Sequence, residues 1–380
     1  MDNIIRKTAS NGEPVILEYL HRLGKINGFP ASATFEITPR CNFNCKMCYI
    51  HSADSNRSVT GELTAEQWLD LARQGRDMGV VAALITGGEP LVRQDFPFIY
   101  SEMKNLGLLV SVNTNGSLIS GDYARFFIDN PPARLNISLY GASDNTYSAL
   151  CGLPAFNTLY KNLNDLVKAG IQIKLNISLT PYNCGDMERM LEIAKELNVH
   201  AKLTTYMYPP VRRGESFCGE NPARFTPDEA AFYRAKYDLI RLGENEFLRR
   251  VDKLEDFISP DECCDPEQPG EKMRCRAGTS SCWINYKGEM TACGMFGGTG
   301  FNAVELGFEK AWRLVRESTE KISTPAKCIN CSYRNLCPMC AAVCASETGC
   351  FDKAPEYACA FSRSSEKYLR EFAERIKNGN

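Results

Sequence analysis

The sequence predicts an α/β fold in which six β-α steps follow one another over residues 33–208. Two observations support this prediction. Short runs rich in β-branched and apolar residues alternate with segments of helical periodicity, and glycine, small polar, cysteine or aromatic residues follow each run. Such alternation indicates parallel strands joined by right-handed crossovers. The sheet is either open and doubly wound or closes into a partial barrel, and both arrangements place ligands at the carboxyl ends of the strands.

The expected strands are short and are bounded by turn-forming residues. They cover residues 33–38, 81–86, 108–113, 134–139, 171–179 and 200–206. The segments at their carboxyl ends read TPRCNFNCKMCY, TGGEP, NTNG, SLYG, SLTPYN and TYMYPP. The amino ends of the runs show no comparable enrichment. This asymmetry indicates a functional site on one face of the sheet.

The segments between the strands carry the apolar stripe of amphipathic helices. In the first, apolar residues recur at i, i+3, i+4 and i+7 from Trp68 to Gly75. Thr64 and Gln67 form a capping box at its start, and Gly79 ends it. Two further stripes consist of Phe156, Leu159, Leu163, Leu166 and Val167, and of Met187, Met190, Leu191 and Ala194.

The chain changes character after residue 208. An irregular segment follows, within which Thr226, Pro227 and Glu229 begin one helix with a cap, a first-turn proline and an N3 glutamate. Cysteine and glycine then become frequent, and an amphipathic pattern ends the chain. We therefore expect an N-terminal extension (1–32), the α/β unit (33–208), a bridging or substrate segment (209–272), a cysteine-rich unit (273–361) and a C-terminal helix (362–380).

Composition excludes several classes of function. The 44 Lys and Arg residues are balanced by 46 Asp and Glu, so no basic excess is present to bind nucleic acid. No run approaches the ~20 apolar residues of a membrane span, and no signal peptide is recognisable, so we expect a cytoplasmic protein. The chain has 18 cysteines and 3 histidines. In a reducing compartment, metal or iron–sulfur ligation explains so many thiols better than disulfides do.

Cys41, Cys45 and Cys48 stand in a C-x3-C-x2-C spacing directly after the first expected strand. Three thiolates on one loop can hold three irons of a [4Fe–4S] cluster and leave the fourth iron without a protein ligand. An open coordination position is typical of a catalytic metal site. The alternative is a zinc knuckle, with His51 as a possible fourth ligand.

This region resembles the radical S-adenosylmethionine (radical SAM) superfamily. The C-x3-C-x2-C loop matches the signature of that superfamily, and Gly87-Gly88-Glu89-Pro90 after the second strand matches its GGEP motif. The resemblance covers roughly residues 33–208 and implies a partial (β/α)6 barrel. The chain departs from the pattern at Met47, where the family usually has an aromatic residue before the third cysteine.

The resemblance also implies the chemistry. The open iron would chelate the amino and carboxylate groups of S-adenosylmethionine, and one electron would cleave the sulfonium to a 5′-deoxyadenosyl radical that abstracts a hydrogen atom from the substrate. The residues that correspond to the family's contacts with S-adenosylmethionine are Gly87, Gly88 and Glu89 near the methionine amino group, Ser138 near the ribose, and, as weaker candidates, Asn115 and Asn176. For the last three residues, the alternative is a turn residue or a helix cap.

The C-terminal cysteines resemble a SPASM domain, which typically carries two auxiliary [4Fe–4S] clusters. By this analogy Cys275, Cys282, Cys293 and Cys340 hold the nearer cluster, and Cys328, Cys331, Cys337 and Cys359 hold the outer one. The usual C-x3-C ending is absent because position 341 is alanine, so Cys344 competes with Cys340 as the ligand. The alternative is structural zinc. Without metal, we expect that residues 275–359 do not fold, since crowded buried thiolates repel one another.

Seven cysteines remain outside these ligand sets, at positions 151, 184, 218, 263, 264, 344 and 350. A lone cysteine is usually a small buried hydrophobe. For Cys218 and the pair Cys263-Cys264, which lie in the irregular segment, a redox or hydrogen-donor role is an alternative.

SPASM-bearing relatives mostly modify peptides or proteins. The resemblance therefore implies an oxidoreductase that installs a cross-link, of thioether type, in a ribosomally made precursor peptide. The alternatives are protein oxidation of the sulfatase-maturase type, a small-molecule radical SAM oxidoreductase, and a zinc or iron–sulfur scaffold without activity. Sulfatase maturases have an aspartate after the cysteine that corresponds to Cys293, whereas this chain has Gly294, which disfavours that alternative.

The expected partners are the precursor peptide and an electron donor such as flavodoxin or ferredoxin. About 32 residues precede the first strand, too few for a separate leader-recognition module. A separate leader-recognition protein, or the segment 209–272, would then read the peptide. Arg212 and Arg213 could pair with peptide carboxylates there, although solvated surface charge is the simpler explanation.

Overall fold

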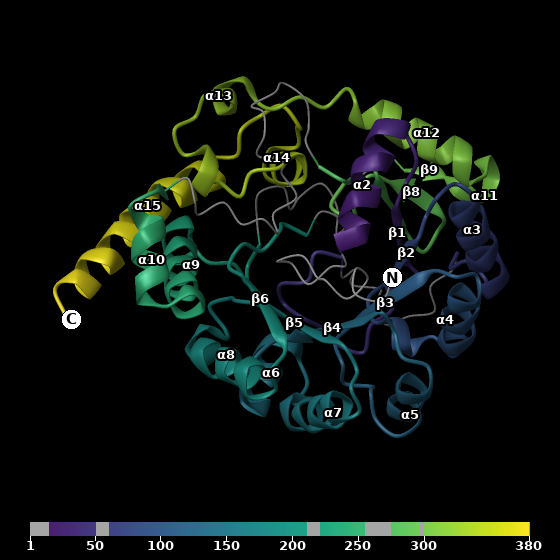
Figure 1. Ribbon diagram of the computed structural model, residues 1–380, viewed down its shortest axis with the longest axis horizontal. Coiled ribbons are helices and arrows are strands. Elements are labelled where there is room, and N and C mark those ends of the chain that lie inside the picture. The colour runs from purple at the N-terminus through teal and green to yellow at the C-terminus, as the bar shows by residue number, and fades with distance from the viewer. Residues whose placement is uncertain (1–14, 51–60, 211–220, 255–274, 297–299, 380) are drawn as a thin grey trace.

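The computed structural model describes residues 15–50, 61–210, 221–254, 275–296 and 300–379. Within this part of the chain, a curved sheet has the strand order β6-β5-β4-β3-β2-β1-β7-β8-β9 (Figure 1). The strands are β1 Ser32–Glu36, β2 Ala82–Thr86, β3 Leu109–Thr114, β4 Arg134–Leu139, β5 Ile173–Ser178, β6 His200–Thr204, β7 Ser281–Ile284, β8 Glu289–Thr291 and β9 Phe301–Asn302. All pairs from β6 to β7 are parallel, and β8 and β9 are antiparallel additions. The predicted parallel sheet of a partial barrel is thus confirmed.

Helices connect the strands and cover the convex face of the sheet (Figure 1). The helices are α2 Val15–Asn27, α3 Ala65–Asp77, η1 Pro90–Val92, α4 Phe96–Asn105, α5 Asp122–Asp129, α6 Asp144–Cys151, α7 Phe156–Lys168, η2 Cys184–Asp186, α8 Met187–Glu196, α9 Pro227–Leu242, α10 Glu244–Val251, α11 Ala303–Leu306, α12 Phe308–Thr319, α13 Ala326–Ile329, η5 Arg334–Leu336, α14 Ala341–Thr348 and α15 Glu356–Lys377. None of the helices in the described residues has the length and apolarity needed to cross a membrane.

Local signals in the sequence explain why these elements form. The capping box of Thr64 and Gln67 is present at the start of α3, and Trp68 is fully buried, with its ring nearly perpendicular to that of Phe35 in β1. Gly79 has φ +109, and a Cβ there would lie 2.8 Å from the ring of Phe29, so only glycine fits this turn. Strand and helix together bury the apolar faces that the periodicity predicted.

Two expectations about helices need correction. Leu191 is only partly buried, and Ile193 instead joins the buried face of α8. The inward stripe therefore follows the i, i+3, i+6 direction from Met187, because a stripe read from spacing alone leaves the border positions undecided. The terminal helix begins at Glu356 rather than at residue 362, so Cys359 lies in its first turn. The domain boundaries themselves stay predictions.

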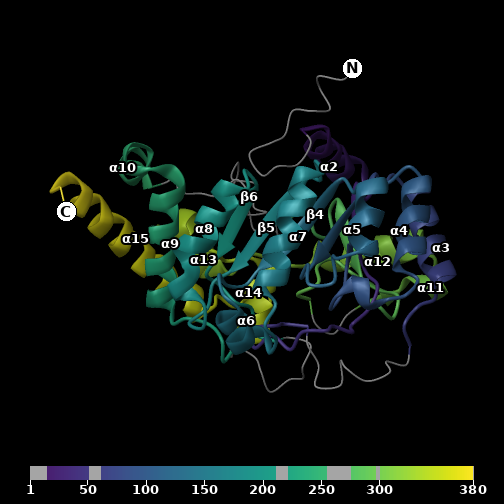
Figure 2. The same cartoon turned by 90° about the horizontal axis from the view of Figure 1, so that it is seen from below.

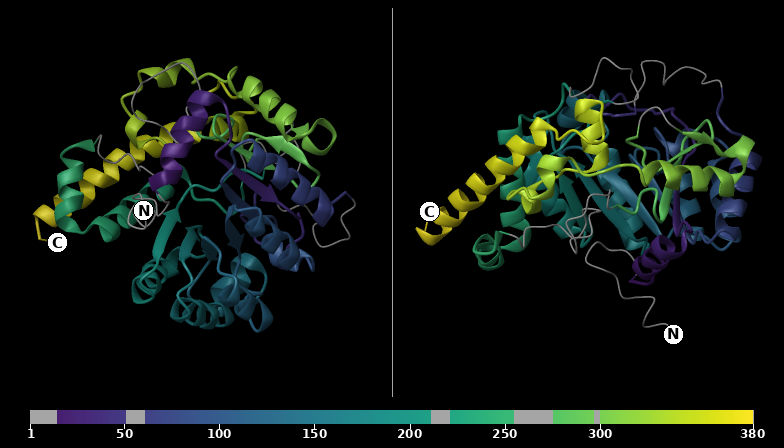
Figure 3. Two further views of the ribbon diagram at one scale, coloured as in Figure 1. Left: turned by 45° about the vertical axis from the view of Figure 1, so that its right-hand side comes forward. Right: turned by 90° about the horizontal axis from the view of Figure 1, so that it is seen from above.

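The cysteine-rich part is continuous with the barrel. β7 pairs in parallel with β1, so the second part of the chain extends the sheet of the first. On the other side, α15 packs along α9 and α10 around Ala235, Phe247 and Leu369 (Figure 3). Figure 2 shows α2 on one side of the molecule and α6 and α14 on the opposite side. Since α6 follows β4, the segment around α14 lies on the side of the strands' carboxyl ends.

Candidate functional site

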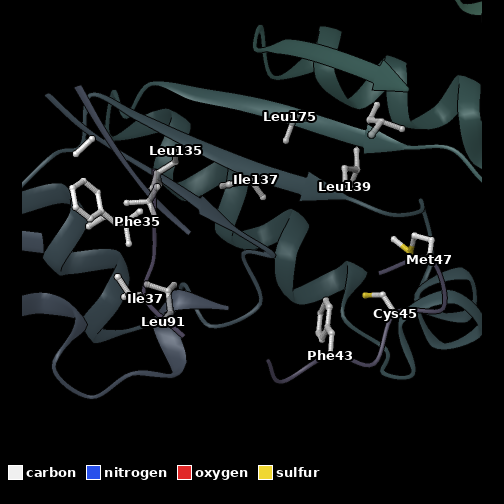
Figure 4. Packing of buried hydrophobic residues seen from close by; sticks show 14 of the residues in the cluster. Phe35, Ile37, Phe43, Cys45, Met47, Leu91, Leu135, Ile137, Leu139 and Leu175 are labelled. Carbon is white, nitrogen blue, oxygen red and sulfur yellow. The ribbon is translucent and has the colours of Figure 1, made fainter. Parts of the chain in front are cut away.

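The three-cysteine loop follows β1 and is held against the carboxyl end of α6. The backbone N–H of Asn44 donates to the carbonyl of Cys151 at 3.0 Å, and that of Lys46 donates to Leu150 at 3.0 Å. Figure 4 shows Phe43, Cys45 and Met47 beyond the end of the sheet where Leu139 lies. Met47, which replaces the family's usual aromatic residue, is buried in this core. The loop is therefore anchored through its backbone and its apolar side chains.

The thiols of this loop are close enough to influence one another. Burial raises the pKa of Cys41 to about 12, and the charges of Glu89, Cys45 and Cys48 add to this effect. The backbone N–H of Phe43 donates to the Cys41 Sγ at 3.4 Å, which favours the thiolate. A hydrogen bond with the Cys151 side chain and burial both raise the pKa of Cys45.

In this structure the three thiols do not adopt the arrangement of ligands around one cluster. The Cys45 thiol forms a hydrogen bond with the free thiol of Cys151, the last residue of α6. Among the described residues, no group of three or more His, Cys, Asp or Glu side chains is arranged to hold a metal ion. The donor chemistry nevertheless suits iron: three thiols share one short loop, and the charges of Cys45 and Cys48 both act on Cys41. His51, the zinc alternative, lies outside the described residues.

Glu89 lies directly across from this loop, in the segment after β2. Its side chain is fully buried and accepts three hydrogen bonds, from Leu91 N at 3.1 Å, from Thr114 Oγ1 at 2.8 Å and from Asn115 N at 2.7 Å. Burial raises the pKa of Glu89 to about 7, although the three hydrogen bonds lower it. The carboxyl group is thus fixed in position and close to its ionisation point at neutral pH.

Gly87 and Gly88 allow the GGEP segment to approach the backbone of residues 38–40 closely. A Cβ on Gly87 would lie 2.5 Å from the carbonyl oxygen of Thr38, and a Cβ on Gly88 would lie 2.4 Å from that of Arg40. The N–H groups of Gly88 and Glu89 donate to the same two carbonyls, each at 2.8 Å. The GGEP segment is therefore hydrogen-bonded to the start of the cysteine loop, and a side chain at either glycine would push them apart.

Asn115 belongs to the same cluster of contacts. Its Nδ2 lies 3.9 Å from the Cys41 Sγ and donates to Asn42 Oδ1 at 2.8 Å. Its Oδ1 accepts from the N–H and the hydroxyl of Ser117, and Asn42 Nδ2 donates to the Ser117 hydroxyl. The predicted residues Cys41, Glu89 and Asn115 are thus brought together at the carboxyl ends of β1, β2 and β3.

Ser138 and Asn176 face each other on neighbouring strands, in register between β4 and β5. Ser138 is linked to the cysteine loop through Tyr140, a residue that sequence reasoning did not select. Burial raises the pKa of Tyr140, and the charge of Cys45 adds to this effect, while a hydrogen bond with Ser138 lowers it. The only signal for Tyr140 in the sequence is its place in SLYG, at the end of a strand.

The four thiols expected in the outer auxiliary site line one cavity of about 70 Å³. Its other lining residues include Arg334, whose positive charge lowers the pKa of Cys328 and Cys337, whereas burial raises the pKa of both thiols. Ser362 and the backbone N–H of Met339 also bond to Cys337. The cysteines of the cavity are Cys328, Cys331, Cys337 and Cys359.

Two of the thiols expected in the nearer auxiliary site, Cys340 and Cys293, lie near one hydroxyl group. The Tyr208 hydroxyl lies 3.9 Å from the Cys340 Sγ, and the charge of Cys293 acts on the same hydroxyl. Cys282, another of the expected ligands, lies in β7. Cys282 pairs with Ala33 of β1. Because successive side chains of a strand alternate between faces, Cys282 and Trp283 lie on opposite faces of the sheet. Burial alone raises the pKa of Cys282 to about 12. Its role as a ligand stays a prediction.

A repeated backbone contact marks four of the predicted ligands. In each, the N–H two residues further along the chain bonds to the cysteine sulfur: Phe43 to Cys41, Ala277 to Cys275, Met295 to Cys293 and Met339 to Cys337. Such bonds stabilise a thiolate and tune the potential of a bound cluster. In each of these loops one backbone N–H therefore favours the charged form of sulfur, although burial outweighs it and raises the pKa of Cys41 and Cys337.

Comparison with known proteins agrees with this geometry. The family model of the radical SAM superfamily matches residues 35–205, which run from β1 to the end of β6. The chain carries a radical SAM domain. Proteins of this superfamily bind a [4Fe–4S] cluster and S-adenosylmethionine. In this chain the three-cysteine loop and the GGEP segment both lie within the matched residues.

Several relatives resemble the chain in sequence. AdoMet-dependent heme synthase from Methanosarcina barkeri is 26% identical over 333 residues, which cover 84% of this chain and 93% of that protein. PqqA peptide cyclase from Streptomyces rochei is 30% identical over 170 residues, which cover 45% of this chain and 46% of that protein. The chain thus spans about half the length of the second relative and most of the first.

Solved structures share the fold beyond the radical SAM domain. Streptococcus suis SuiB bound to S-adenosylmethionine has a TM-score of 0.65 and 19% identity, over 89% of this chain and 79% of SuiB. The structure of anSMEcpe with bound AdoMet has a TM-score of 0.69 and 16% identity, over 92% of this chain and all (100%) of that one. The likeness therefore includes the cysteine-rich part of the chain.

Proposed function

We propose that this protein is a radical SAM enzyme that abstracts a hydrogen atom from a ribosomally made peptide and installs a cross-link, of thioether type. The contact of Cys41 with the Glu89 and Asn115 cluster carries this proposal, because it joins the three-cysteine loop to the GGEP segment. The peptide substrate is supported by the fold shared with SuiB, one structure of which contains the precursor peptide SuiA.

Cys41, Cys45 and Cys48 are the residues that would hold the [4Fe–4S] cluster. When bound, this cluster supplies the electron that cleaves S-adenosylmethionine. The Cys45 thiol has to turn away from Cys151 to take part. Glu89 would accept hydrogen bonds from the methionine amino group, with its carboxylate already oriented by the N–H of Asn115 at 2.7 Å.

The other residues of the domain would place the nucleoside part of S-adenosylmethionine. Gly87 and Gly88 let the backbone approach the ligand, and Ser138 would contact the ribose. Asn176 lies in register with Ser138 and would share that contact, while Asn115 would add a polar group next to Cys41. Each of these roles rests on the family resemblance.

Two auxiliary [4Fe–4S] clusters complete the proposed cofactor set. The cavity lined by the four outer thiols supports the outer site, and the Tyr208 contact supports Cys340 and Cys293 as neighbours in the nearer site. An auxiliary cluster can bind a substrate thiolate or accept an electron after ring closure. The expected electron donor is a flavodoxin or a ferredoxin, and a separate leader-recognition protein would present the peptide.

The structure adds a steric argument against oxidation of the sulfatase-maturase type. A Cβ on Gly294 would lie 2.8 Å from the ring of Trp283, so the tryptophan occupies the space that an aspartate would need here. The Trp283 Nε1 in turn donates to the buried carboxylate of Glu36 at 2.7 Å, which fixes the ring. The base expected of that class therefore has no room at this position.

A second candidate function is a reaction on a haem precursor. The match to AdoMet-dependent heme synthase favours it, since it extends over 84% of this chain, whereas the match to PqqA peptide cyclase extends over 45%. This candidate is a form of the small-molecule alternative. It keeps the same roles for the three-cysteine loop and the GGEP segment.

One experiment separates the two functions. The protein is reconstituted anaerobically with iron and sulfide, reduced with dithionite, and incubated with S-adenosylmethionine and either a cysteine-bearing precursor peptide encoded nearby or an iron-bearing haem precursor. We expect 5′-deoxyadenosine in both samples and a mass loss of two hydrogens only in the peptide. Conversion of the haem precursor alone would instead establish the second candidate.

A further inference from the structure

Tyr208 stands where the end of the barrel meets the cysteine-rich part. It follows β6 by four residues, and its hydroxyl lies 3.9 Å from the Sγ of Cys340, 132 positions further along the chain. That residue is the N-cap of α14. The phenol therefore forms a direct contact between the radical SAM domain and a thiol expected to bind an auxiliary cluster.

The backbone and ring of Tyr208 are fixed from several sides. Asn221 Nδ2 donates to the Tyr208 carbonyl at 2.7 Å. The ring of Tyr206 packs edge-on against that of Tyr208, with 5.0 Å between the centroids. The segments 201–210 and 221–225 thus position the hydroxyl before any cofactor binds.

Tyr206 is held by a buried ion pair. Its hydroxyl donates to Glu347 Oε1 at 2.6 Å, and Arg224 Nη1 donates to the same oxygen at 2.6 Å. The two charged side chains are 6% and 15% exposed. The guanidinium also lies 4.3 Å from the ring centroid of Tyr357 in α15. Contacts from α14 and α15 thereby fix the two tyrosines that follow β6.

We infer that Tyr208 is a positioning residue that donates its hydroxyl hydrogen bond to the thiolate of Cys340 and so raises the reduction potential of the nearer auxiliary cluster. This inference rests on the proposed function, because it requires that cluster. A hydrogen bond to a ligating sulfur stabilises the additional negative charge of the reduced cluster. The same contact selects Cys340 over Cys344, which is fully buried one helical turn further along α14.

The test uses the full-length chain with Cys41, Cys45 and Cys48 replaced by alanine, so that only auxiliary clusters bind. After anaerobic reconstitution we expect about eight irons per chain, as two [4Fe–4S] clusters require. A redox titration followed by electron paramagnetic resonance then gives two midpoint potentials. We expect Tyr208→Phe to lower one of them and to leave the other unchanged.

Tyr357→Phe is the matched control. It also removes a buried phenol hydroxyl, but this one donates to the carbonyl of Phe225 at 3.0 Å rather than to sulfur. Both potentials should stay as they are in the parent. Unchanged potentials in Tyr208→Phe, or an equal shift in Tyr357→Phe, would overturn the inference. Binding of four or fewer irons by the parent would overturn both the inference and the proposed auxiliary clusters, whereas failure of the peptide reaction alone affects only the proposed substrate.

A second variant covers the case in which Tyr208→Phe does not hold its clusters. Fluorotyrosine at position 208 keeps the shape of the ring and has a more acidic hydroxyl, so it donates a stronger hydrogen bond. The potential of the same cluster should then rise, opposite to the phenylalanine variant. Iron counts complete the test: Cys340→Ser should lose a cluster that Cys344→Ser retains, and the reverse result would contradict the inference.

Discussion

The carboxylate of Glu89 accepts the backbone N–H of Asn115 at 2.7 Å, and the side chain of Asn115 reaches to 3.9 Å from the Cys41 sulfur. The ends of three neighbouring strands are joined by this arrangement. Glu89 also has its pKa raised to about 7 by burial. The residue expected to bind the methionine ammonium is therefore expected to ionise close to neutral pH.

The affinity for S-adenosylmethionine should consequently rise with pH. A carboxylate binds an ammonium group, whereas the protonated acid that prevails below the pKa does not. With the Glu89 pKa at about 7, the ionised fraction and hence the affinity rise about tenfold from pH 6 to pH 8. Anaerobic titration calorimetry measures this, and buffer-dependent heats report the proton released. Glu89→Gln should bind weakly with a flat pH profile; the same slope in that variant would contradict the assignment.

Gly88→Ala should disrupt the three-cysteine loop. The new Cβ would lie 2.4 Å from the Arg40 carbonyl oxygen, a backbone atom that cannot move alone. Overpacking of this kind costs about 1–3 kcal/mol, and we expect the variant to hold less iron in the first cluster. Gly185→Ala is the control, since nothing lies within 4 Å of a Cβ there. Iron content and thermal unfolding measure both, and equal behaviour of the two variants would refute the steric argument.

Much of the fold could be predicted because its signals are local. The capping box of Thr64 with Gln67 and the alternation of strands and helices depend on neighbours within a few positions of the sequence. The GGEP segment was recognisable for the same reason. Glycine is needed there because a Cβ would lie too close to the carbonyl oxygens of Thr38 and Arg40, and these distances come only from the structure.

The contacts that could not be predicted join distant segments. Glu347 accepts hydrogen bonds from Tyr206 and Arg224, which lie 141 and 123 positions away in the sequence. No periodicity in the sequence encodes such contacts. The face of Cys282 was also hidden, because it depends on the parallel pairing of β7 with β1. Spacing identifies a cysteine as a possible ligand, but only the register of the strand decides where its thiol points.

Cys41→Ala should abolish formation of 5′-deoxyadenosine with dithionite, because the first cluster loses a ligand. Cys151→Ala is the matched control: it removes a buried free thiol that hydrogen-bonds to Cys45 but is not a predicted ligand, and cleavage should persist. Cys359→Ala, in the outer cavity, should leave some cleavage uncoupled from product. Chromatography of 5′-deoxyadenosine measures all three. Full cleavage in Cys41→Ala would reject the assignment of the catalytic cluster.

Glu347→Ala should destabilise the junction between barrel and cysteine-rich part. The carboxylate accepts from Arg224 and Tyr206, and its removal takes a counter-ion away from a largely buried guanidinium. Breaking a buried pair in this way costs about 3–5 kcal/mol. The double variant with Arg224→Ala should lose less than the sum of the single variants in thermal unfolding. Glu196→Ala, which breaks an exposed pair with Arg189, should change little; an equal loss there would contradict the argument.

Removal of iron should unfold the cysteine-rich segment before the barrel. Around α13, η5 and α14 the buried side chains are few, and apart from Met339 they are small; two of them are the cysteines Cys328 and Cys344. Little apolar burial is available there to offset the conformational entropy of ordering the chain, so bound metal has to supply the difference.

Hydrogen exchange of the iron-loaded and chelator-treated protein measures this order of unfolding. We expect the amides of α14 (Ala341–Thr348) to lose protection after chelation, whereas those of β2 to β5 keep it because their strands are paired on both sides. The helix α15 is an internal control, since its contact with α9 and α10 buries Leu369 and Ala373 without any thiol. The amides in the second half of α15 should stay protected from hydrogen exchange after chelation. Equal protection of α14 with and without iron would show that the segment folds by its own packing, and the case for metal at these cysteines would fail.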